Sequence, residues 1–388
     1  MAKFHLVYHL HVPALLKVFR FSEIGHANYY FNDHHNELYL NELANSRILP
    51  FLRLVHQLGQ RSQGKFKMSV SVSGTSLNLF QRYCPEVINE LSHLVKQDCL
   101  KFLAATYADF IPDGISETVI AGQIKEHRRL IEQLFNQKPS FFRRIPGANR
   151  GGLIPVLSDL KLSGIIDPFW KEEIKVSEEQ TSVYRKHDFY IIEEDHYIQN
   201  AIQRMKRQNP VITDELVAYE LMKQLGTENT YSFTLTHDLS SLKQEYLSAN
   251  FWKMFVDLFS PNPDNRFVTA SELVEPNNIL LESADCQIKK AVLEAWNDLQ
   301  LEANDALVNL SRLIQNSLDT HPRMDWRFLL DTEHLQFMSS KFFAEDYSTT
   351  HFTPYNSPYE AFTNFMNVVT DLSQKLESCA ENKKQTSF

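Results

Sequence analysis

Short apolar runs rich in β-branched and aromatic residues alternate with longer polar segments of helical period along the first two thirds of the chain. Such runs predict strands, and the segments between them predict helices. Strands are expected at 4–10, 66–72, 101–107, 140–145, 164–167, 189–193, 231–236 and 267–270. Helices are expected at 36–61, 86–97, 117–136, 153–162, 213–224 and 241–259. Because strands that alternate with helices form parallel sheets, these roughly seven or eight units predict a closed or nearly closed β/α barrel.

The pattern changes after about residue 283, where it becomes helical throughout. Helices are expected at 284–317, 323–345 and 357–378. We therefore predict a β/α barrel domain over 1–283 and a helical domain over 284–380 that packs on it. Residues 381–388 are expected to form a flexible tail.

Composition excludes several classes of protein. The chain of 388 residues has a formal net charge of −9, so no broad basic face for nucleic acid or an acidic membrane is expected. No apolar run is long enough to span a bilayer, and the apolar N-terminal segment lacks a small-residue cleavage site, so a cytoplasmic location is expected. The four cysteines are scattered and predict neither a disulfide framework nor a thiolate zinc site; they are Cys84, Cys99, Cys286 and Cys379.

Carboxylates stand at several predicted strand ends, where a β/α barrel carries its catalytic groups. Asp109, Asp167 and Asp238 are the candidates. A glycosidase needs two such groups at a defined separation, which the sequence does not give. A lone Asp after a strand is also a common helix N-cap, and Asp238 fits that role well.

His9 and His11 come at the end of the first predicted strand. Alternate residues of a strand face the same side, so the two rings could hold a metal ion together. The other histidines near strand ends, His187, His196 and His237, lie at no recognisable ligand spacing. The favoured interpretation is that one ring lines a polar cleft and the other is structural, with no metal and no cofactor.

Several segments, in order along the chain, resemble the α-amylase branch of glycoside hydrolase family 57. They are HLHVP (9–13), GKFKMSVSVSGTSLNLFQRYCPEVI (64–88), CLKFLAATYAD (99–109), LLDTEHLQFMSSK (329–341) and SPYEAFTNFMNVVTDL (357–372). The resemblance implies an incomplete seven-stranded β/α barrel followed by a helical segment that closes the cleft.

Active members of that family cleave or transfer α-glucosyl units with retention, through a glutamate nucleophile and an aspartate acid/base. When the nucleophile motif is laid over 142–147, Pro146 stands where the glutamate belongs. The acid/base motif places Leu235 at the aspartate, or Asp238 after a slip of three residues. The last motif keeps a carboxylate and a histidine, Glu333 and His334.

The resemblance therefore implies a protein that binds an α-glucan such as glycogen, starch or a maltooligosaccharide without cleaving it, or that assists a glucan-metabolising protein. The implied binding residues are His11, Asp109, Trp170, His237, Asp238, Glu333 and His334. Two alternatives stay open. One is an active α-glucan hydrolase or transferase that uses Asp109 and Asp238, and the other is a metal-dependent hydrolase built on His9 and His11. The oligomeric state also stays open.

Overall fold

The computed structural model describes residues 2–26, 29–145, 150–167, 183–193, 197–225, 230–237, 248–274, 281–282, 296–315, 320–343 and 353–385. Statements about structure below refer to these residues.

The first strand, β1 (Lys3–Leu10), is buried along its whole length. A strand inside a parallel sheet is covered on both faces, so its polar side chains need partners within the protein. His5 has one, because its Nε2 lies 2.9 Å from Ser69 Oγ. Burial lowers the pKa of His5 to about 3, so the ring is neutral in the core.

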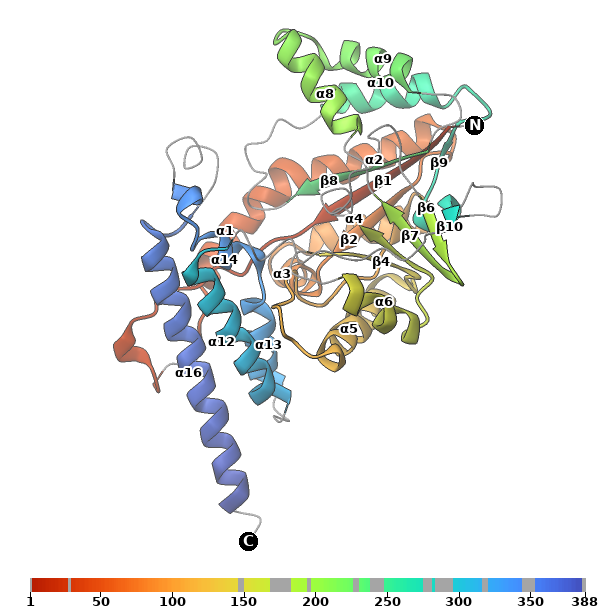
Figure 1. Ribbon diagram of the computed structural model, residues 1–388. Coiled ribbons are helices and arrows are strands. Elements are labelled where there is room, and N and C mark those ends of the chain that lie inside the picture. The colour runs from red at the N-terminus through yellow and green to blue at the C-terminus, as the bar shows by residue number, and fades with distance from the viewer. Residues whose placement is uncertain are drawn as a thin grey trace.

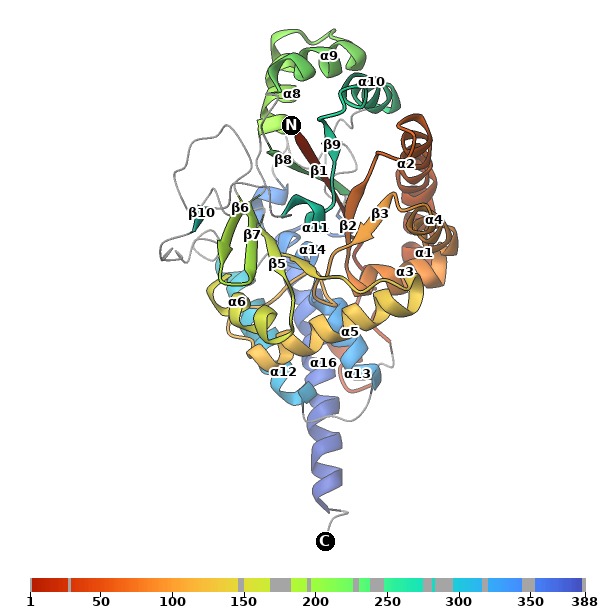
Figure 2. The ribbon, with the colours of Figure 1, turned by 90° about the vertical axis from the view of Figure 1, so that its right-hand side faces the viewer.

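The strands form two sheets that continue into each other (Figure 2). In the first, β3-β2-β1-β8 are neighbours, and in the second, β4-β5-β7, with all of these pairs parallel. A parallel bridge between Ala104 and Phe142 joins β3 to β4. The bounds are β2 (Met68–Val72), β3 (Leu100–Phe102), β4 (Phe141–Arg143), β5 (Gly164–Asp167), β7 (Phe189–Glu193) and β8 (Thr230–His237). Among the described residues no pairing joins β7 to β8, so the fold is an incomplete β/α barrel, as predicted.

Three further short strands extend the sheets. The two-residue strand β9 (Arg266–Phe267) pairs with the beginning of β1 and confirms only the first part of the run predicted at 267–270. The sequence pattern missed β6 (Val183–Lys186), which is antiparallel to β7, and β10 (Leu281–Glu282), which pairs with β6. The turn between β6 and β7 places His187 at a φ of 55°, in the left-handed region.

Helices cover the strands. The helix predicted at 36–61 is confirmed as one continuous run, with a π-helical stretch over Ala44–Ile48 in its middle. Helices α3 and α8 were not predicted. The bounds are α1 (Asp33–Leu43), α2 (Leu49–Arg61), α3 (Gly74–Tyr83), α4 (Pro85–Lys96), α5 (Glu117–Phe135), α6 (Arg150–Asp159), α8 (Tyr197–Gln208), α9 (Asp214–Gln224), α10 (Ala249–Phe259) and α11 (Ala270–Leu273), with a 3-10 turn at Phe21–Glu23.

The C-terminal part of the chain is helical, and Figure 1 shows it beside the barrel at the end opposite α8, α9 and α10. Its elements are α12 (Asp298–Gln315), α13 (Thr320–Leu329), α14 (Thr332–Gln336), a 3-10 turn (Ser340–Phe343) and α16 (Pro358–Gln385). The single helix predicted at 323–345 is wrong, because the chain leaves the helix after Leu329 and Asp331 caps a new one. The predicted domain boundary near 283 lies at the edge of the described residues and stays a prediction.

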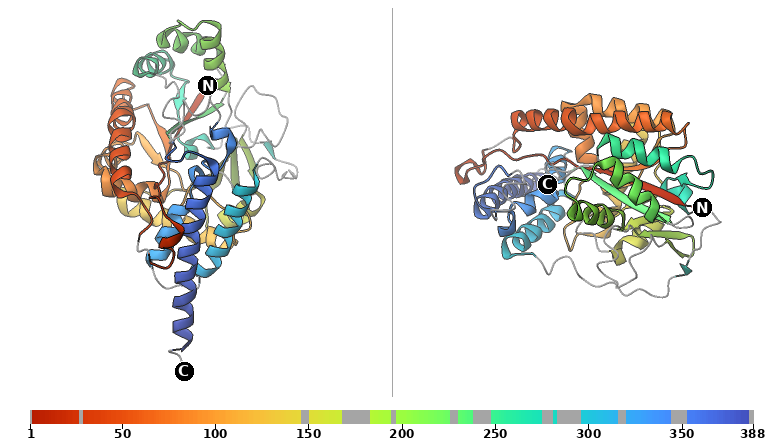
Figure 3. Two further views of the ribbon diagram at one scale, coloured as in Figure 1. Left: turned by 90° about the vertical axis from the view of Figure 1, so that its left-hand side faces the viewer. Right: turned by 90° about the horizontal axis from the view of Figure 1, so that it is seen from above.

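Helix α16 packs against the segment that follows β1. Asn364 Oδ1 accepts a hydrogen bond of 2.6 Å from the backbone of Phe19, and Tyr30 donates one of 2.7 Å to Asp371. Beyond these contacts α16 extends away from the strands to Gln385, into the segment predicted to be a flexible tail (Figure 3). Among the described helices, none combines the length and the apolar character needed to cross a membrane.

Candidate functional site

The carboxyl ends of β1, β2 and β3 bring polar side chains together. His11 follows β1, Ser73 follows β2, and Asp109 lies beyond β3. Ser73 is the N-cap of α3, and its Oγ accepts a hydrogen bond from the Ser76 backbone. Gly74 begins this helix because a Cβ there would lie 2.7 Å from the ring of Tyr107. The tight packing of α3 on this ring fixes Ser73 beside His11.

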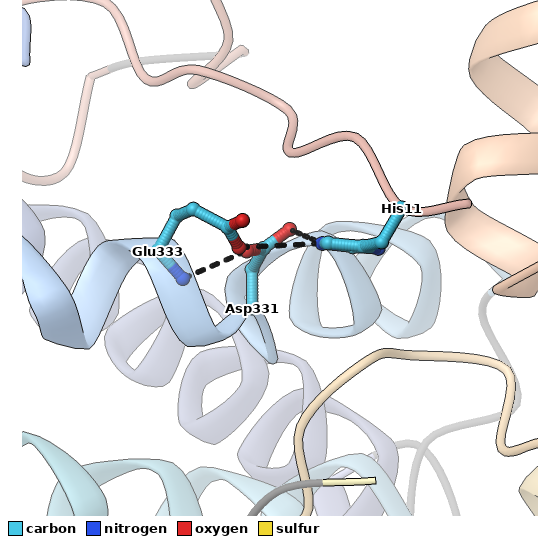
Figure 4. Close-up of side chains that lie close together, drawn as sticks. All are labelled: His11, Asp331 and Glu333. Atoms are coloured by element: carbon cyan, nitrogen blue, oxygen red, sulfur yellow. Dashed lines mark hydrogen bonds and ion pairs between the residues drawn. The ribbon is translucent and has the colours of Figure 1, made fainter. Parts of the chain in front are cut away.

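His11 is the centre of the site. Its Nδ1 lies 3.0 Å from Ser73 Oγ, and its Nε2 lies 3.0 Å from Asp331 Oδ2 and 3.4 Å from Glu333 Oε2 (Figure 4). The ring is 1% exposed. A residue at the end of the first strand is therefore held by two carboxylates that come from a helix more than three hundred residues later.

Helix α14 delivers both of these carboxylates. Asp331 is its N-cap, and Asp331 Oδ1 accepts a hydrogen bond of 3.0 Å from the backbone N–H of Glu333. Since a helix N-terminus favours negative charge, this turn tolerates two carboxylates in succession. Both side chains are almost fully buried and both face His11 (Figure 4).

His9 and Asp109 extend the cluster on the barrel side. Asp109 Oδ1 lies 3.6 Å from His9 Nε2 and 3.8 Å from His11 Nδ1, so both rings face the same carboxylate, as alternate positions at a strand end require. Burial lowers the pKa of His9 well below its usual value, and the nearby Arg143 and His11 lower it further. The ring of His9 is therefore neutral.

Burial and the neighbouring charges have opposite effects on the pKa of His11. Burial by itself would lower the pKa of His11, but Asp109, Asp331 and Glu333 together raise it well above the usual value of 6.5. Burial and the neighbouring Asp331 raise the pKa of Glu333 to about 7. In the absence of any bound ion, the cluster is therefore a buried imidazolium among carboxylates, of which one is easily protonated.

His334, a predicted binding residue, turns away from this cluster. Its Nε2 lies 3.3 Å from the carbonyl oxygen of Phe328, and its ring packs on that of Phe365. Burial lowers its pKa to about 4. The contacts of His334 lie within the helical segment.

Arg144 and Asp167 form a second buried group, at the ends of β4 and β5. Arg144 Nη1 lies 3.1 and 3.0 Å from the two oxygens of Asp167. Both side chains are almost completely buried. Asp167, one of the strand-end carboxylates, is therefore engaged by a guanidinium.

Several predicted site positions fall where the structure gives no side-chain description. Pro146, Trp170 and Asp238 lie outside the described residues. His237 ends β8 and Leu235 lies within it, but only the backbone is described at these two positions. The sequence analysis missed Asp331 and Ser73 as site residues, although Asp331 lies inside the segment 329–341 that resembles the family.

Residues 5–157 match the family model described as Glycosyl hydrolase family 57. This part of the chain resembles glycosyl hydrolase family 57. The match covers β1 to β4 and the helices between them, including His11 and Asp109, but less than half of the chain. The resemblance noted in the sequence is confirmed over this segment. No curated protein sequence matches the chain.

Several solved structures share the fold over nearly the whole chain, among them a branching enzyme of family 57 type. A branching enzyme of this family from Thermococcus kodakaraensis has a TM-score of 0.57 at 11% identity, covering 97% of this chain and 94% of its own. The alpha-amylase of Thermotoga maritima has a TM-score of 0.56 at 12% identity, covering 97% of this chain and 93% of its own.

The 4-alpha-glucanotransferase of Thermococcus litoralis has a TM-score of 0.54 at 12% identity and is covered over 55% of its length by 94% of this chain. The chain thus spans little more than half of that relative. At identities this low the likeness establishes the fold alone: an incomplete barrel with a helical segment.

Proposed function

We propose that the chain is an α-glucan-binding homologue of glycosyl hydrolase family 57 that does not cleave its ligand. The family match over 5–157 and the fold shared with three enzymes named for α-glucan or starch chemistry support the ligand class. The proposed lack of cleavage rests on Pro146, which stands where the family's glutamate nucleophile belongs when the family motif is laid over 142–147.

A retaining glycosidase needs a carboxylate nucleophile about 5–5.5 Å from a second carboxyl group that serves as acid and base. Proline has no ionisable group and cannot form a glycosyl ester. Loss of a covalent nucleophile lowers kcat by about 10³- to 10⁶-fold in comparable enzymes. Binding to remote sugar units does not need that group, so affinity can persist without turnover.

At the neighbouring strand ends, neither Asp167 nor Asp109 is placed to replace the missing carboxylate nucleophile. Asp167 is held by the buried guanidinium of Arg144. Asp109 faces His9 and His11 and is 5% exposed. A carboxylate that is enclosed and paired with a cation is a poor nucleophile toward an anomeric carbon. This arrangement supports binding over catalysis.

One observation favours the alternative of an active enzyme. A carboxylic acid with a pKa of about 7, such as Glu333, is suited to act as a general acid at neutral pH. Its partner would be Asp109 or Asp238, the relocated carboxylates. The same assay tests both proposals.

The test combines calorimetric titration with maltooligosaccharides and a reducing-sugar assay on glycogen and starch. We expect heat of binding from the wild type and from the control Asp113→Asn, whose side chain is exposed. We expect no release of reducing ends from the wild type, Asp113→Asn or Asp109→Asn. Hydrolysis by the wild type and Asp113→Asn that disappears in Asp109→Asn would overturn the proposal of an inactive protein. Absence of binding heat with every glucan would overturn the ligand class.

A further inference from the structure

The hydrogen bonds around His11 determine which ring nitrogen carries a proton. Ser73 Oγ donates its single proton to Ser76 Oγ at 2.7 Å, and Ser76 in turn donates to the carbonyl oxygen of Val12 at 3.3 Å. Because Ser73 Oγ already donates to Ser76, Ser73 Oγ accepts a proton from His11 Nδ1 at 3.0 Å, and Ser76 Oγ lies 3.2 Å from the same ring nitrogen. The remaining ring nitrogen, Nε2, is the one that faces Asp331 and Glu333.

A lone pair on Nε2 that faced two carboxylate oxygens would be repelled by both. A proton or a metal cation between these three atoms removes this repulsion. A proton on Nε2 serves one oxygen well, and Asp331 Oδ2 at 3.0 Å takes it. Glu333 Oε2 is then left at 3.4 Å, buried and without a hydrogen-bond partner. A side chain that is 6% exposed and whose oxygen lacks a hydrogen bond points to a missing positive partner.

The three atoms have the spacing of a metal coordination shell. Bonds of about 2.0–2.1 Å from zinc to nitrogen and oxygen at tetrahedral angles put neighbouring ligand atoms about 3.4 Å apart. Nε2 lies 3.0 and 3.4 Å from the two oxygens, and all three atoms lie within 4.8 Å of one another. Two features also hold these ligands in orientation. One is the Nδ1–H bond to Ser73, and the other is the Glu333 N–H bond to Asp331 Oδ1.

We propose that His11 Nε2, Asp331 and Glu333 bind a divalent transition-metal ion of the zinc or manganese class. One cation would neutralise both carboxylates, which a proton on the ring cannot do. Asp109, whose Oδ1 lies 3.8 Å from the His11 ring, adds a further negative charge nearby. The imidazole ligand favours zinc over magnesium or calcium, and the two carboxylates also suit manganese.

This site differs from the histidine pair considered in the sequence. His9 contributes no atom to it, and two ligands come from α14 instead of the barrel. The ion would join residue 11 to residues 331 and 333, and so link the helical segment to the end of β1 (Figure 4). It acts as a bridge between two parts of the chain, independently of glucan binding.

The test is metal binding by the full chain. Protein stripped with a chelator is dialysed against Zn²⁺ or Mn²⁺, and bound metal is measured by elemental analysis and by calorimetric titration. We expect one equivalent for the wild type. We expect at least a ten-fold loss of affinity for Glu333→Gln and for His11→Gln, with little or no response to Mg²⁺. Glu333→Gln keeps the shape of the protonated side chain, and we therefore expect it to fold. Circular dichroism of the variant checks this.

A surface pair of histidines provides the control. The rings of His56 and His93 lie 5.1 Å apart on exposed helix faces and could capture zinc adventitiously. We expect His56→Gln/His93→Gln to keep the tight equivalent. If that double variant loses the metal and Glu333→Gln retains it, or if the stripped wild type takes up no metal, the proposed site is wrong and a proton bridges the cluster.

Discussion

His127 offers a test of how the barrel holds its strand ends near the site. The ring comes from α5 and is completely buried. The backbone N–H of Ala105 donates to Nδ1 at 3.2 Å, so Nε2 carries the proton and donates it to the carbonyl oxygen of Val72 at 2.8 Å. The neutral ring thus joins the end of β2 to the segment that leads from β3 to Asp109. A second proton on Nδ1 would destroy the first bond.

The cost of acidification follows from this geometry. Burial lowers the pKa of His127 from 6.5 to about 4. Between pH 6.5 and about pH 4 this histidine is protonated in the unfolded chain and neutral in the folded protein. The free energy of unfolding therefore falls as the pH falls below 6.5. Each unit of pH costs about 1.4 kcal/mol, and the loss from about pH 6.5 to about pH 5 is about 2 kcal/mol from this ring alone.

Urea denaturation of metal-free protein at several pH values measures the effect. His127→Gln keeps a donor and an acceptor but cannot titrate. We expect it to lower stability near neutral pH and to lose about 2 kcal/mol less than the wild type between about pH 6.5 and about pH 5. The exposed His26→Gln serves as the control and should follow the wild type. If the free energy of unfolding depends on pH in the same way for the wild type and for His127→Gln, His127 is not the buried, neutral ring described above.

Two further predictions concern packing and charge close to the site. Gly74→Ala would place a Cβ 2.7 Å from the Tyr107 ring and should lower the free energy of unfolding by about 1–3 kcal/mol. Gly122→Ala lies inside α5, where the added carbon meets no atom within 4 Å beyond the neighbouring backbone of its own helix, and it should raise the free energy of unfolding by up to about 1 kcal/mol. Equal effects of the two substitutions in urea denaturation would contradict this packing. Asp167→Asn leaves the buried guanidinium of Arg144 without its ion pair and should cost about 3–5 kcal/mol, whereas a change within about 0.5 kcal/mol would show that the pair is not buried in solution.

The sequence predicted the elements whose signal is local. Strand β1 was evident because a buried parallel strand forms a nearly continuous apolar run. Strand β3 was predicted too long, since residues beyond Phe102 leave the ladder and only Ala104 pairs onward, with Phe142. Strands β6 and β10 were missed because their short, polar sequences carry no apolar run, and their pairing is set by β7.

The site was only partly predictable for a related reason. His11 follows β1 directly, and Asp109 follows the strand predicted at 101–107, which ends earlier, at Phe102. Because a barrel carries its functional groups beyond the carboxyl ends of its strands, both residues could be proposed in advance. The contact between His11 and Asp331 joins residues 320 positions apart, and it depends on where α14 begins. The contact between His11 and Glu333 depends on the same helix start. The sequence pattern predicted one unbroken helix at 323–345, so the helix start at Asp331, which directs both carboxylates toward His11, was not predicted.

The burial of the cluster constrains how it could serve a glucan. As whole residues, His11, Asp331 and Glu333 are each at most 4% exposed. The ring nitrogens of His11 contact Ser73 and Asp331, and the other oxygen of Asp331 accepts a hydrogen bond from the backbone of Glu333. A sugar hydroxyl could reach them only if α14 moved away from the end of β1, whereas a single ion fits between atoms that already lie at coordination spacing. The cluster is therefore better suited to joining the helical segment to the barrel than to direct sugar contact. For this reason calorimetry with metal and calorimetry with maltooligosaccharide answer separate questions, and failure of one leaves the other standing.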